Sequence, residues 1–136
     1  MWRAALSPGD PHRVWVAERG ESLLGFAAWG SARDADAGPG LAEVYAIYLE
    51  QAAAGTGIAE TLMARALGEM GSQGFGEATL WVLAENPRAR RFYERGGWRL
   101  DGATKTVDLL GSVLEAVRYR TAVARSSGPR PLDGAG

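Results

Sequence analysis

The sequence contains no cysteine and only one histidine, His12, among its 136 residues. A chain without cysteine has no disulfide, no thiolate nucleophile and no Cys-ligated metal. His12 lies in a polar stretch flanked by proline. Metal catalysis and Ser-His chemistry therefore have almost no residues to work with, and we expect no bound metal.

Long apolar runs and a strong net charge are missing as well. No run approaches the roughly 20 apolar residues that span a bilayer, and the start lacks the basic-then-apolar order of a secretory signal. The formal net charge is −1, which argues against the phosphate-neutralising surface of nucleic-acid binders. We therefore expect a cytoplasmic protein with no membrane partner and no nucleic-acid partner.

What the sequence does contain is the composition of a globular domain. Hydrophobic residues make up 46% of the chain and charged residues 23%, close to the averages for soluble proteins. The length suits one domain, which we place at residues 1–123. Residues 124–136 are mostly Arg, Ser, Gly and Pro without apolar periodicity, which predicts a disordered tail.

Hydrophobic periodicity predicts an α/β fold. A short helix at 2–6 precedes a hairpin of strands at 14–18 and 23–30, a polar loop at 31–40 and a buried strand at 41–49. Helical spacing begins at Ile58 and runs for about four turns, with glycines at the stop. The later elements are a strand at 78–83, a helix from N-cap Asn86 to Arg95, extended segments at 98–100 and 104–108, and a strand at 114–123.

These elements give a mixed sheet with the order β-β-β-α-β-α-β-β. A strand, a helix and a strand in succession indicate a parallel pair joined by a right-handed crossover.

Small residues dominate the joint between the 41–49 strand and its helix, from Glu50 to Ala59. They allow a ligand to approach the backbone, and the first-turn N–H groups of the helix point out with the positive end of its dipole. A pyrophosphate fits such a place. The same residues also suit a tight, closely packed turn.

A second motif, LWVLAENPRARRFYERGGW, spans 80–98. Together with Gly57-x-Ala59 and the helix that follows it, the elements Asn86-x-x-Ala89-x-x-x-Tyr93 and Gly97-Trp98 resemble the GNAT superfamily of N-acetyltransferases. The likeness covers about residues 14–123. It implies the GNAT fold, with acetyl-CoA as cosubstrate.

The resemblance also implies where acetyl-CoA binds. The loop 54–59 would hold the pyrophosphate, although Ala54 stands where the family usually has Gln or Arg. The strands 41–49 and 80–83 would splay apart so that the pantetheine arm pairs with their backbone. The cofactor-binding residues expected are Ile47, Tyr48, Leu49, Ala54, Gly55, Thr56, Gly57, Ile58, Ala59, Asn86, Ala89 and Phe92.

An amine that attacks a thioester forms an oxyanion and expels a thiolate, so the site needs a hydrogen-bond donor and an acid. By resemblance, the N–H of Leu49 is the candidate donor and Tyr93 the candidate acid. From the helix pattern alone, core packing is the better reading of Tyr93, and the presence of Asn86 and Ala89 reverses this in favour of the acid. Arg88 and Arg91 are further candidates for phosphate contacts, or members of a solvated basic face.

The amine must lose a proton, because an ordinary alkylamine has a pKa near 10. Glu43 is the candidate base. On a regular strand it shares a face with Tyr45, Ile47 and Leu49. A solvated glutamate at the strand end is the alternative.

The chain departs from the family at its start. GNAT domains normally begin with a strand and two helices, whereas only 13 residues precede Val14 here. We therefore expect an N-terminally truncated form in which the first hairpin strand is an exposed edge. Exposed edges and apolar faces are usually covered, which predicts a homodimer or marginal stability.

The function predicted is transfer of an acetyl group from acetyl-CoA to a primary amine, on a small molecule or at a peptide or protein N-terminus. Asp34 and Asp36 in the 31–40 loop suit a cationic acceptor. The alternative is a non-catalytic module that binds acyl-CoA or a protein partner. A domain binding some other phosphate is less well supported, because the chain lacks a P-loop and a full Gly-x-Gly-x-x-Gly.

Overall fold

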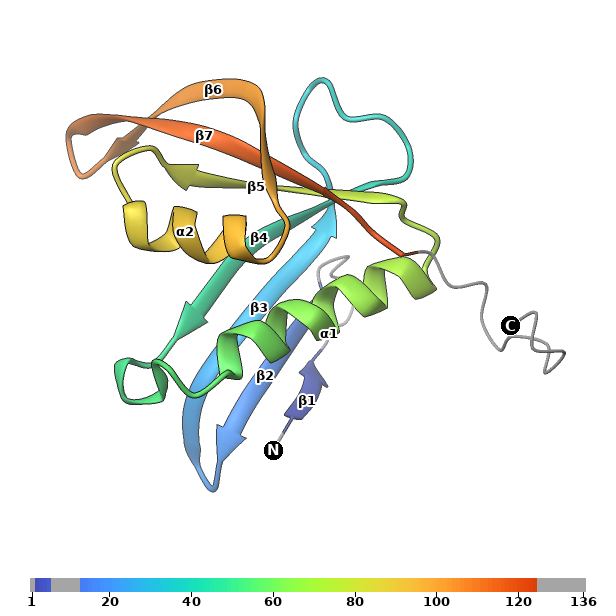
Figure 1. Cartoon of the computed structure of the whole chain (residues 1–136), viewed down its shortest axis with the longest axis vertical. Coiled ribbons are helices and arrows are strands. Elements are labelled where there is room, and N and C mark those ends of the chain that lie inside the picture. Colours follow the sequence, from blue (N-terminus) through green and yellow to red (C-terminus); the bar gives the residue numbers. More distant parts are fainter. Residues whose placement is uncertain (1, 6–12, 125–136) are drawn as a thin grey trace, which may run out of the picture. The chain divides into compact units, whose positions relative to one another are not determined.

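A computed structural model describes residues 2–5 and 13–124. These residues divide into two compact units, shown with the rest of the chain in Figure 1. The first unit contains the described residues up to Ala78 together with 122–124, and the second is Thr79–Thr121. Most of the predicted tail, 125–136, and His12 lie outside the described residues.

The first unit is built on an antiparallel sheet. Its neighbouring strands, in order, are β1 (Trp2–Ala5), β2 (Arg13–Arg19), β3 (Ser22–Ser31) and β4 (Leu41–Leu49). The predicted hairpin and the loop before β4 are confirmed, and β4 has the predicted bounds.

The N-terminal residues differ from the prediction. Residues 2–5 form a strand rather than the start of a helix, and they pair antiparallel with β2 from Trp2↔Ala17 to Ala5↔Val14. A four-residue segment has little helical stability of its own, so pairing with a neighbouring strand decides its conformation. The expectation that β2 would be an exposed edge is therefore wrong, because β1 covers that edge.

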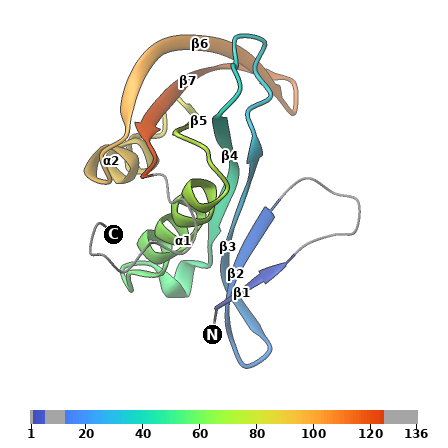
Figure 2. The ribbon, with the colours of Figure 1, turned by 90° about the vertical axis from the view of Figure 1, so that its right-hand side faces the viewer.

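Helix α1 (Ile58–Ser72) packs on one face of β2, β3 and β4, as Figure 2 shows. It follows a 3-10 turn, η1 (Gln51–Ala53). The predicted apolar stripe faces the sheet, with Leu62, Met63, Ala66 and Met70 buried. At Gly25 the approach is so close that a Cβ would lie 2.6 Å from the carbonyl oxygen of Tyr48 and 3.1 Å from Leu62 Cδ1.

One polar contact ties α1 to this face. A single oxygen of Glu69, Oε1, accepts hydrogen bonds from the indole N–H groups of Trp15, at 3.1 Å, and Trp29, at 2.8 Å. Trp29 is 2% exposed. No sequence pattern predicts this arrangement, because Glu69 lies 40 residues or more from either tryptophan along the chain.

The second unit contains β5 (Glu77–Leu83) from Thr79 on, α2 (Pro87–Arg95), β6 (Arg99–Leu109) and most of β7 (Ser112–Ala122). Its strand order is β5-β7-β6. The ring of Tyr93 packs on those of Trp98 and Tyr119, with centroid distances of 6.3 and 6.0 Å. Leu80 and Val82 are buried as well.

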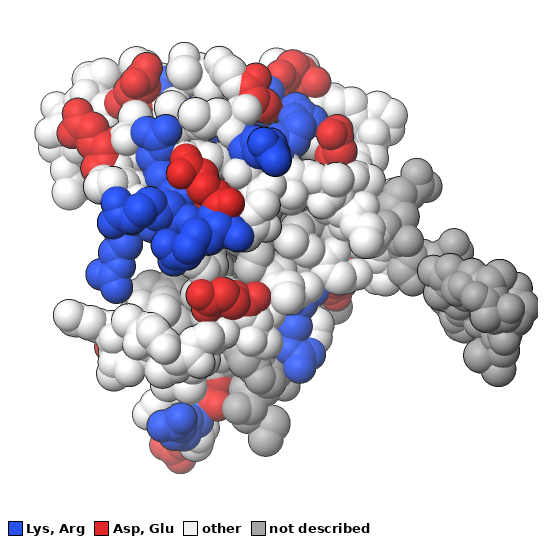
Figure 3. All heavy atoms as spheres, in the orientation of Figure 1, with Lys and Arg blue, Asp and Glu red and all other residues white. Residues whose placement is uncertain are grey.

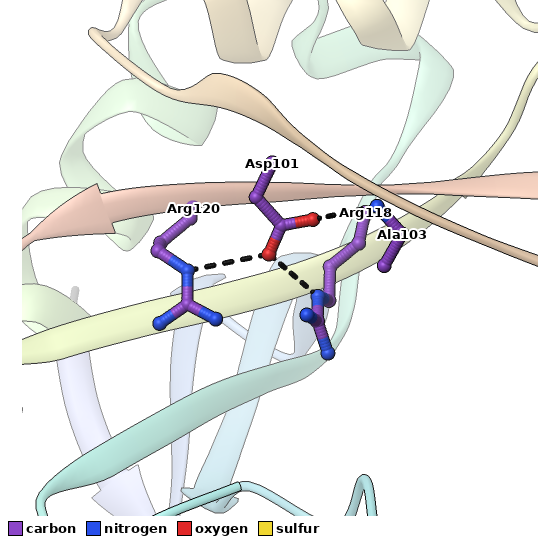
Figure 4. A network of polar contacts seen from close by, with 4 residues as sticks. All are labelled: Asp101, Ala103, Arg118 and Arg120. Atoms are coloured by element: carbon purple, nitrogen blue, oxygen red, sulfur yellow. Dashed lines mark hydrogen bonds and ion pairs between the residues drawn. The ribbon is translucent and has the colours of Figure 1, made fainter. Parts of the chain in front are cut away.

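Strand β6 joins the two extended segments that were predicted separately, 98–100 and 104–108. An irregularity in the pairing with β7 lies between Leu100 and Thr104. There Asp101 accepts the Ala103 N–H at 3.0 Å through one carboxylate oxygen. Its other oxygen binds Nε of Arg118 at 2.7 Å and Nε of Arg120 at 3.2 Å, as Figure 4 shows.

The predicted α/β class is confirmed. From residue 13 on, the elements follow the predicted order β-β-β-α-β-α-β-β, and β1 precedes them. Among the described residues, no helix has the length and apolar character that a membrane span requires.

Candidate active site

The loop before α1 leaves the start of the helix open. Gly57 is the N-cap, with φ 85°, and no side chain caps the helix. A φ in this left-handed region favours glycine, and Gly55 has φ 79°. The first-turn N–H groups of a helix have no acceptor within it, so they are available to an anion. The structure thus brings together the predicted residues Ala54, Gly55, Thr56, Gly57, Ile58 and Ala59.

Thr56 and Thr61 stabilise this loop without covering it. The Thr56 hydroxyl donates to the carbonyl of Ala53, and the Thr61 hydroxyl donates to the carbonyl of Gly57 at 3.0 Å. Ala54, Gly55, Thr56 and Gly57 are all exposed. The loop therefore has a defined backbone whose outer surface is accessible.

The backbone of β4 presents polar groups on the edge away from β3. The N–H of Glu50 donates to the carbonyl of Leu24 at 2.8 Å, so these two residues form a hydrogen-bonded pair. Hydrogen-bonded and non-hydrogen-bonded pairs alternate in an antiparallel ladder, which makes Leu49↔Gly25 a non-hydrogen-bonded pair. The N–H of Leu49, the predicted oxyanion donor, therefore points away from β3, and the same holds for Ile47.

In the second unit, Asn86 and Pro87 begin α2 as predicted. The Asn86 side-chain oxygen accepts the N–H of Ala89 at 3.1 Å, which is the ordinary role of an N-cap. Its amide NH₂ group has no partner within the described residues. Asn86 therefore has a structural role in α2 and a free donor.

Tyr93, on α2, has a buried ring and a hydroxyl without a hydrogen-bond partner among the described residues. The ring lies 5.5 Å from Phe92 and packs on Trp98 and Tyr119. Every buried side-chain polar atom of the described residues has a hydrogen-bond partner, and the Tyr93 hydroxyl has none there, so this hydroxyl is not buried. Burial of the ring raises the pKa of Tyr93 above its ordinary value. The phenol is thus protonated at neutral pH.

Glu43 lies on a different face from the one predicted. Ala28 pairs with Ala46 while the next residue of β3, Trp29, pairs with Val44, so β4 has one extra residue at this point. A β-bulge of one residue reverses the alternation of faces. Ile47 and Leu49 therefore face α1, whereas Glu43, opposite Gly30, faces the other side. The expectation that Glu43 shares the face of Ile47 and Leu49 is wrong.

The Glu43 carboxylate is buried, at 4% exposure, and has a partner. One oxygen accepts the backbone N–H of Arg33 at 3.0 Å, and the other lies 3.5 Å from the Arg33 guanidinium. That guanidinium also lies 3.8 Å from the ring centroid of Tyr45, whose hydroxyl donates to the Ser31 carbonyl. Glu43 therefore fixes the start of the loop between β3 and β4.

Arginines cover the outer face of α2, where Figure 3 shows the Lys and Arg side chains gathered. Arg88, Arg91 and Arg95 are exposed and have no partner within the described part of the chain. Arg90 differs, because it donates to the Tyr119 hydroxyl at 2.9 Å and to the Ala84 carbonyl at 3.0 Å. Arg88 and Arg91 are thus free to meet an anion, whereas Arg90 is structural.

Two residues near Leu49 were not predicted. The ring of Phe26 stacks on Tyr48, and the carboxylate of Glu50 accepts a hydrogen bond from the Tyr48 hydroxyl. Only the register of β3 against β4 places Phe26 opposite Tyr48. The sequence pattern gave no signal for this pairing.

Among the described residues, no group of three or more potential metal-binding side chains is found.

Comparison with known proteins decides the family. The model of the acetyltransferase (GNAT) family matches residues 2–98. This chain belongs to the GNAT family. The resemblance of the two motifs to that family is thereby confirmed.

Individual relatives agree with this assignment. A mycothiol acetyltransferase of Streptomyces scabiei is 37% identical over 89 residues, covering 65% of this chain and 28% of the relative. A probable N-acetyltransferase of Mycobacterium tuberculosis is 32% identical over 108 residues, covering 79% of this chain and 59% of the relative. The chain thus spans a third or less of the mycothiol acetyltransferases it matches.

A solved structure shows the same fold. The N-acetyltransferase from Staphylococcus aureus superposes with a TM-score of 0.70 at 26% identity, over 82% of this GNAT chain and 67% of its own. The GNAT fold is therefore established for this chain.

Proposed function

We propose that this chain is an N-acetyltransferase that moves an acetyl group from acetyl-CoA to a primary amine of a small molecule or of a peptide or protein N-terminus. The observation that carries the proposal is the uncapped start of α1, with Gly57 in the left-handed conformation, a few residues after the outward-facing N–H of Leu49. An anion site and an oxyanion donor on one continuous segment suit a thioester of a pyrophosphate-bearing cosubstrate.

In this proposal, different residues assist different steps of the reaction. The amine nitrogen forms a bond to the carbonyl carbon, and the carbon–sulfur bond breaks. The N–H of Leu49 would stabilise the oxyanion, and the Tyr93 hydroxyl would give its proton to the departing thiolate. Burial raises the pKa of Tyr93, so the phenol is protonated at neutral pH and can act as a donor to the sulfur.

The proton lost by the amine needs an acceptor, for which Glu43 remains the prediction. Glu43 lies six residues before Leu49, which is about 20 Å along a strand that rises about 3.3 Å per residue. This distance is too long for direct contact between the Glu43 carboxylate and an amine beside Leu49. Glu43 would therefore act through ordered water, with its carboxylate held by Arg33.

In this proposal, backbone groups make more of the contacts with acetyl-CoA than side chains do. Ala54 offers no polar group where the family usually has Gln or Arg, so the first-turn N–H groups of α1 would carry most of the pyrophosphate contact. Exposed Arg88 and Arg91, without partners in the described part, could add a contact to phosphate. We propose Ile47 and Leu49 as backbone partners of the pantetheine arm, and Asn86, Ala89 and Phe92 as further contacts.

A Tyr93→Phe variant tests the proposal. Loss of the general acid should lower kcat about 100-fold, within the range for removal of one acid–base group. The affinity for acetyl-CoA, measured by calorimetry, should stay within about twofold, because the ring still packs. A variant with unchanged amine-dependent release of CoA would contradict the role of Tyr93. A wild-type chain that binds acetyl-CoA but releases none would instead favour the non-catalytic module.

A further inference from the structure

One face of the first unit's sheet carries no helix of that unit. Among the described residues α1 is its only α-helix, and α1 covers the face of Trp15 and Trp29 (Figure 2). The opposite face of β2, β3 and β4 presents Val16, Phe26 and Tyr48 in one row of cross-strand partners. The next row consists of Val14, Ala28 and Ala46.

Two aromatic rings and a carboxylate meet at one end of this face. The rings of Phe26 and Tyr48 are stacked, with centroids 5.7 Å apart and planes inclined by 27°. The Tyr48 hydroxyl donates to Oε2 of Glu50 at 2.8 Å. This hydrogen bond, with smaller effects of burial and of the Glu50 charge, raises the pKa of Tyr48, so the phenol remains a donor.

The group is open to a ligand. Tyr48 is 42% exposed although it is a large aromatic residue. Oε1 of Glu50 has no partner within the described part of the chain. An aromatic face beside a carboxylate is the combination that binds organic cations, since the ring quadrupole and the negative charge attract the same ligand.

The position of the group relates it to the proposed reaction. Leu49 lies between Tyr48 and Glu50, and its N–H points to the edge of β4 where the carbonyl of the acetyl group would lie. A cation held by Tyr48 and Glu50 would lie on the sheet face opposite α1, one residue along the chain from that N–H. The apolar row beyond it, with Ala28 and Ala46, would meet the rest of the ligand.

We propose that Phe26, Tyr48 and Glu50 bind the acceptor, and that the acceptor is a primary amine on an apolar chain, which binds as its ammonium and loses a proton before its nitrogen attacks the thioester. The proposal rests on the proposed function for its meaning in catalysis, but cation binding at this site can be measured without turnover. Glu50 and Tyr48 are binding residues here, and they determine specificity.

Comparison of a quaternary ammonium probe with a neutral molecule of the same shape tests whether the site recognises positive charge. Choline and its neutral isostere 3,3-dimethylbutan-1-ol are titrated into the full chain without acetyl-CoA, and binding is followed by NMR. Choline should bind about tenfold more tightly, because only choline gains the cation–π and carboxylate contacts. Equal affinities in the wild-type chain would overturn the proposal.

Matched variants locate the site. Glu50→Gln and Tyr48→Leu should each lower the choline preference about fivefold or more, whereas Tyr48→Phe should retain most of it, since the ring remains. Glu21→Gln, which changes an exposed carboxylate in the turn between β2 and β3, should leave it intact. A Glu50→Gln variant that behaves like Glu21→Gln would also overturn the proposal.

Kinetics distinguish this inference from the proposed function. With an apolar primary amine as acceptor, Glu50→Gln should raise the KM for the amine about fivefold, while the affinity for acetyl-CoA is unchanged. Choline preference without any acetyl transfer would refute the proposed function and leave the cation site standing. Acetyl transfer without choline preference would refute the cation site and leave the proposed function standing.

Discussion

Tyr93 combines a buried ring with a hydroxyl that is not buried, and its pKa follows from the burial. A tyrosine whose folded-state pKa is raised above its ordinary value of about 10 keeps its proton longer when folded than when unfolded. Its contribution to stability is thus complete below pH 10 and is lost as the pH rises through the raised pKa.

We therefore predict that the thermal stability of the wild-type chain falls more steeply than that of Tyr93→Phe above about pH 10. Calorimetric melting temperatures between pH 8 and 11.5 check this. Ultraviolet absorbance over the same pH range follows tyrosine ionisation. Compared with wild type, Tyr93→Phe should lack one of the tyrosines that ionise above the ordinary pKa. Parallel stability curves for the two proteins would contradict the raised pKa.

Glu69 illustrates a polar contact that stabilises the attachment of α1 to the sheet. Glu69→Ala leaves two indole N–H groups without their acceptor, one of them on the buried Trp29, and should lower the free energy of unfolding by about 3 kcal/mol. Glu60→Ala, at an exposed position of the same helix, should change it by about 0.5 kcal/mol or less. Urea unfolding followed by circular dichroism measures both, and equal costs would refute the role of Glu69.

At the scale of single residues, the identity of the important groups could be predicted from sequence more accurately than the direction of their side chains. Asn86 and Pro87 begin α2, and Gly57 caps α1, because these residue types have strong local preferences. The face of Glu43 could not be predicted, because one extra residue in β4 reverses the alternation. A bulge depends on pairing with another strand and leaves no pattern in the strand's own sequence.

Among the elements, β6 and β7 depend on Asp101. Burial opposes ionisation of Asp101, but the Ala103 N–H, the bond and charge of Arg118 and the bond of Arg120 together hold its pKa below the ordinary value. A depressed carboxyl pKa contributes stability above the unfolded value of about 4, and this contribution is lost as the pH falls through the folded pKa.

Asp101→Asn should therefore cost about 3 kcal/mol at pH 7, because Arg118, with a side chain 6% exposed, loses this carboxylate. The difference from wild type should shrink as the pH falls below about 4 and through the lowered pKa of the folded state, where the wild-type carboxyl becomes protonated as well. Glu115→Gln, at an exposed position on β7, is the control. A difference that stays constant from pH 7 to pH 3 would contradict this account.

Most elements could be predicted from sequence because their signals are local. Periods of 3.6 and 2, caps and turn glycines located both helices and six of the seven strands. Strand β1 was missed, because its four residues are a strand only through pairing with β2. The motifs at 54–59 and 86–93 were informative for function because each joins a helix start to specific residue types.

For the whole molecule, the sequence predicted a homodimer or marginal stability. One reason for that prediction is gone, since β1 covers the edge of β2. The other reason remains, namely the sheet face opposite α1. A dimer that buried this face would also close the proposed acceptor site, so the two forms of binding should compete.

We predict association at high concentration that choline reverses. Light scattering after size exclusion should give a mass approaching twice 14.4 kDa at high concentration, and a lower mass when choline is present. A mass of 14.4 kDa at every concentration would contradict the homodimer. A dimer that choline leaves intact would show that dimerisation uses a different surface.

The central claim is that this chain, which spans a third or less of the mycothiol acetyltransferases it matches, itself binds acetyl-CoA and transfers its acetyl group. The most direct test is calorimetric titration of the purified chain with acetyl-CoA, followed by an assay of CoA release with apolar primary amines. We predict micromolar binding and release that depends on the amine. Absence of acetyl-CoA binding would contradict the account.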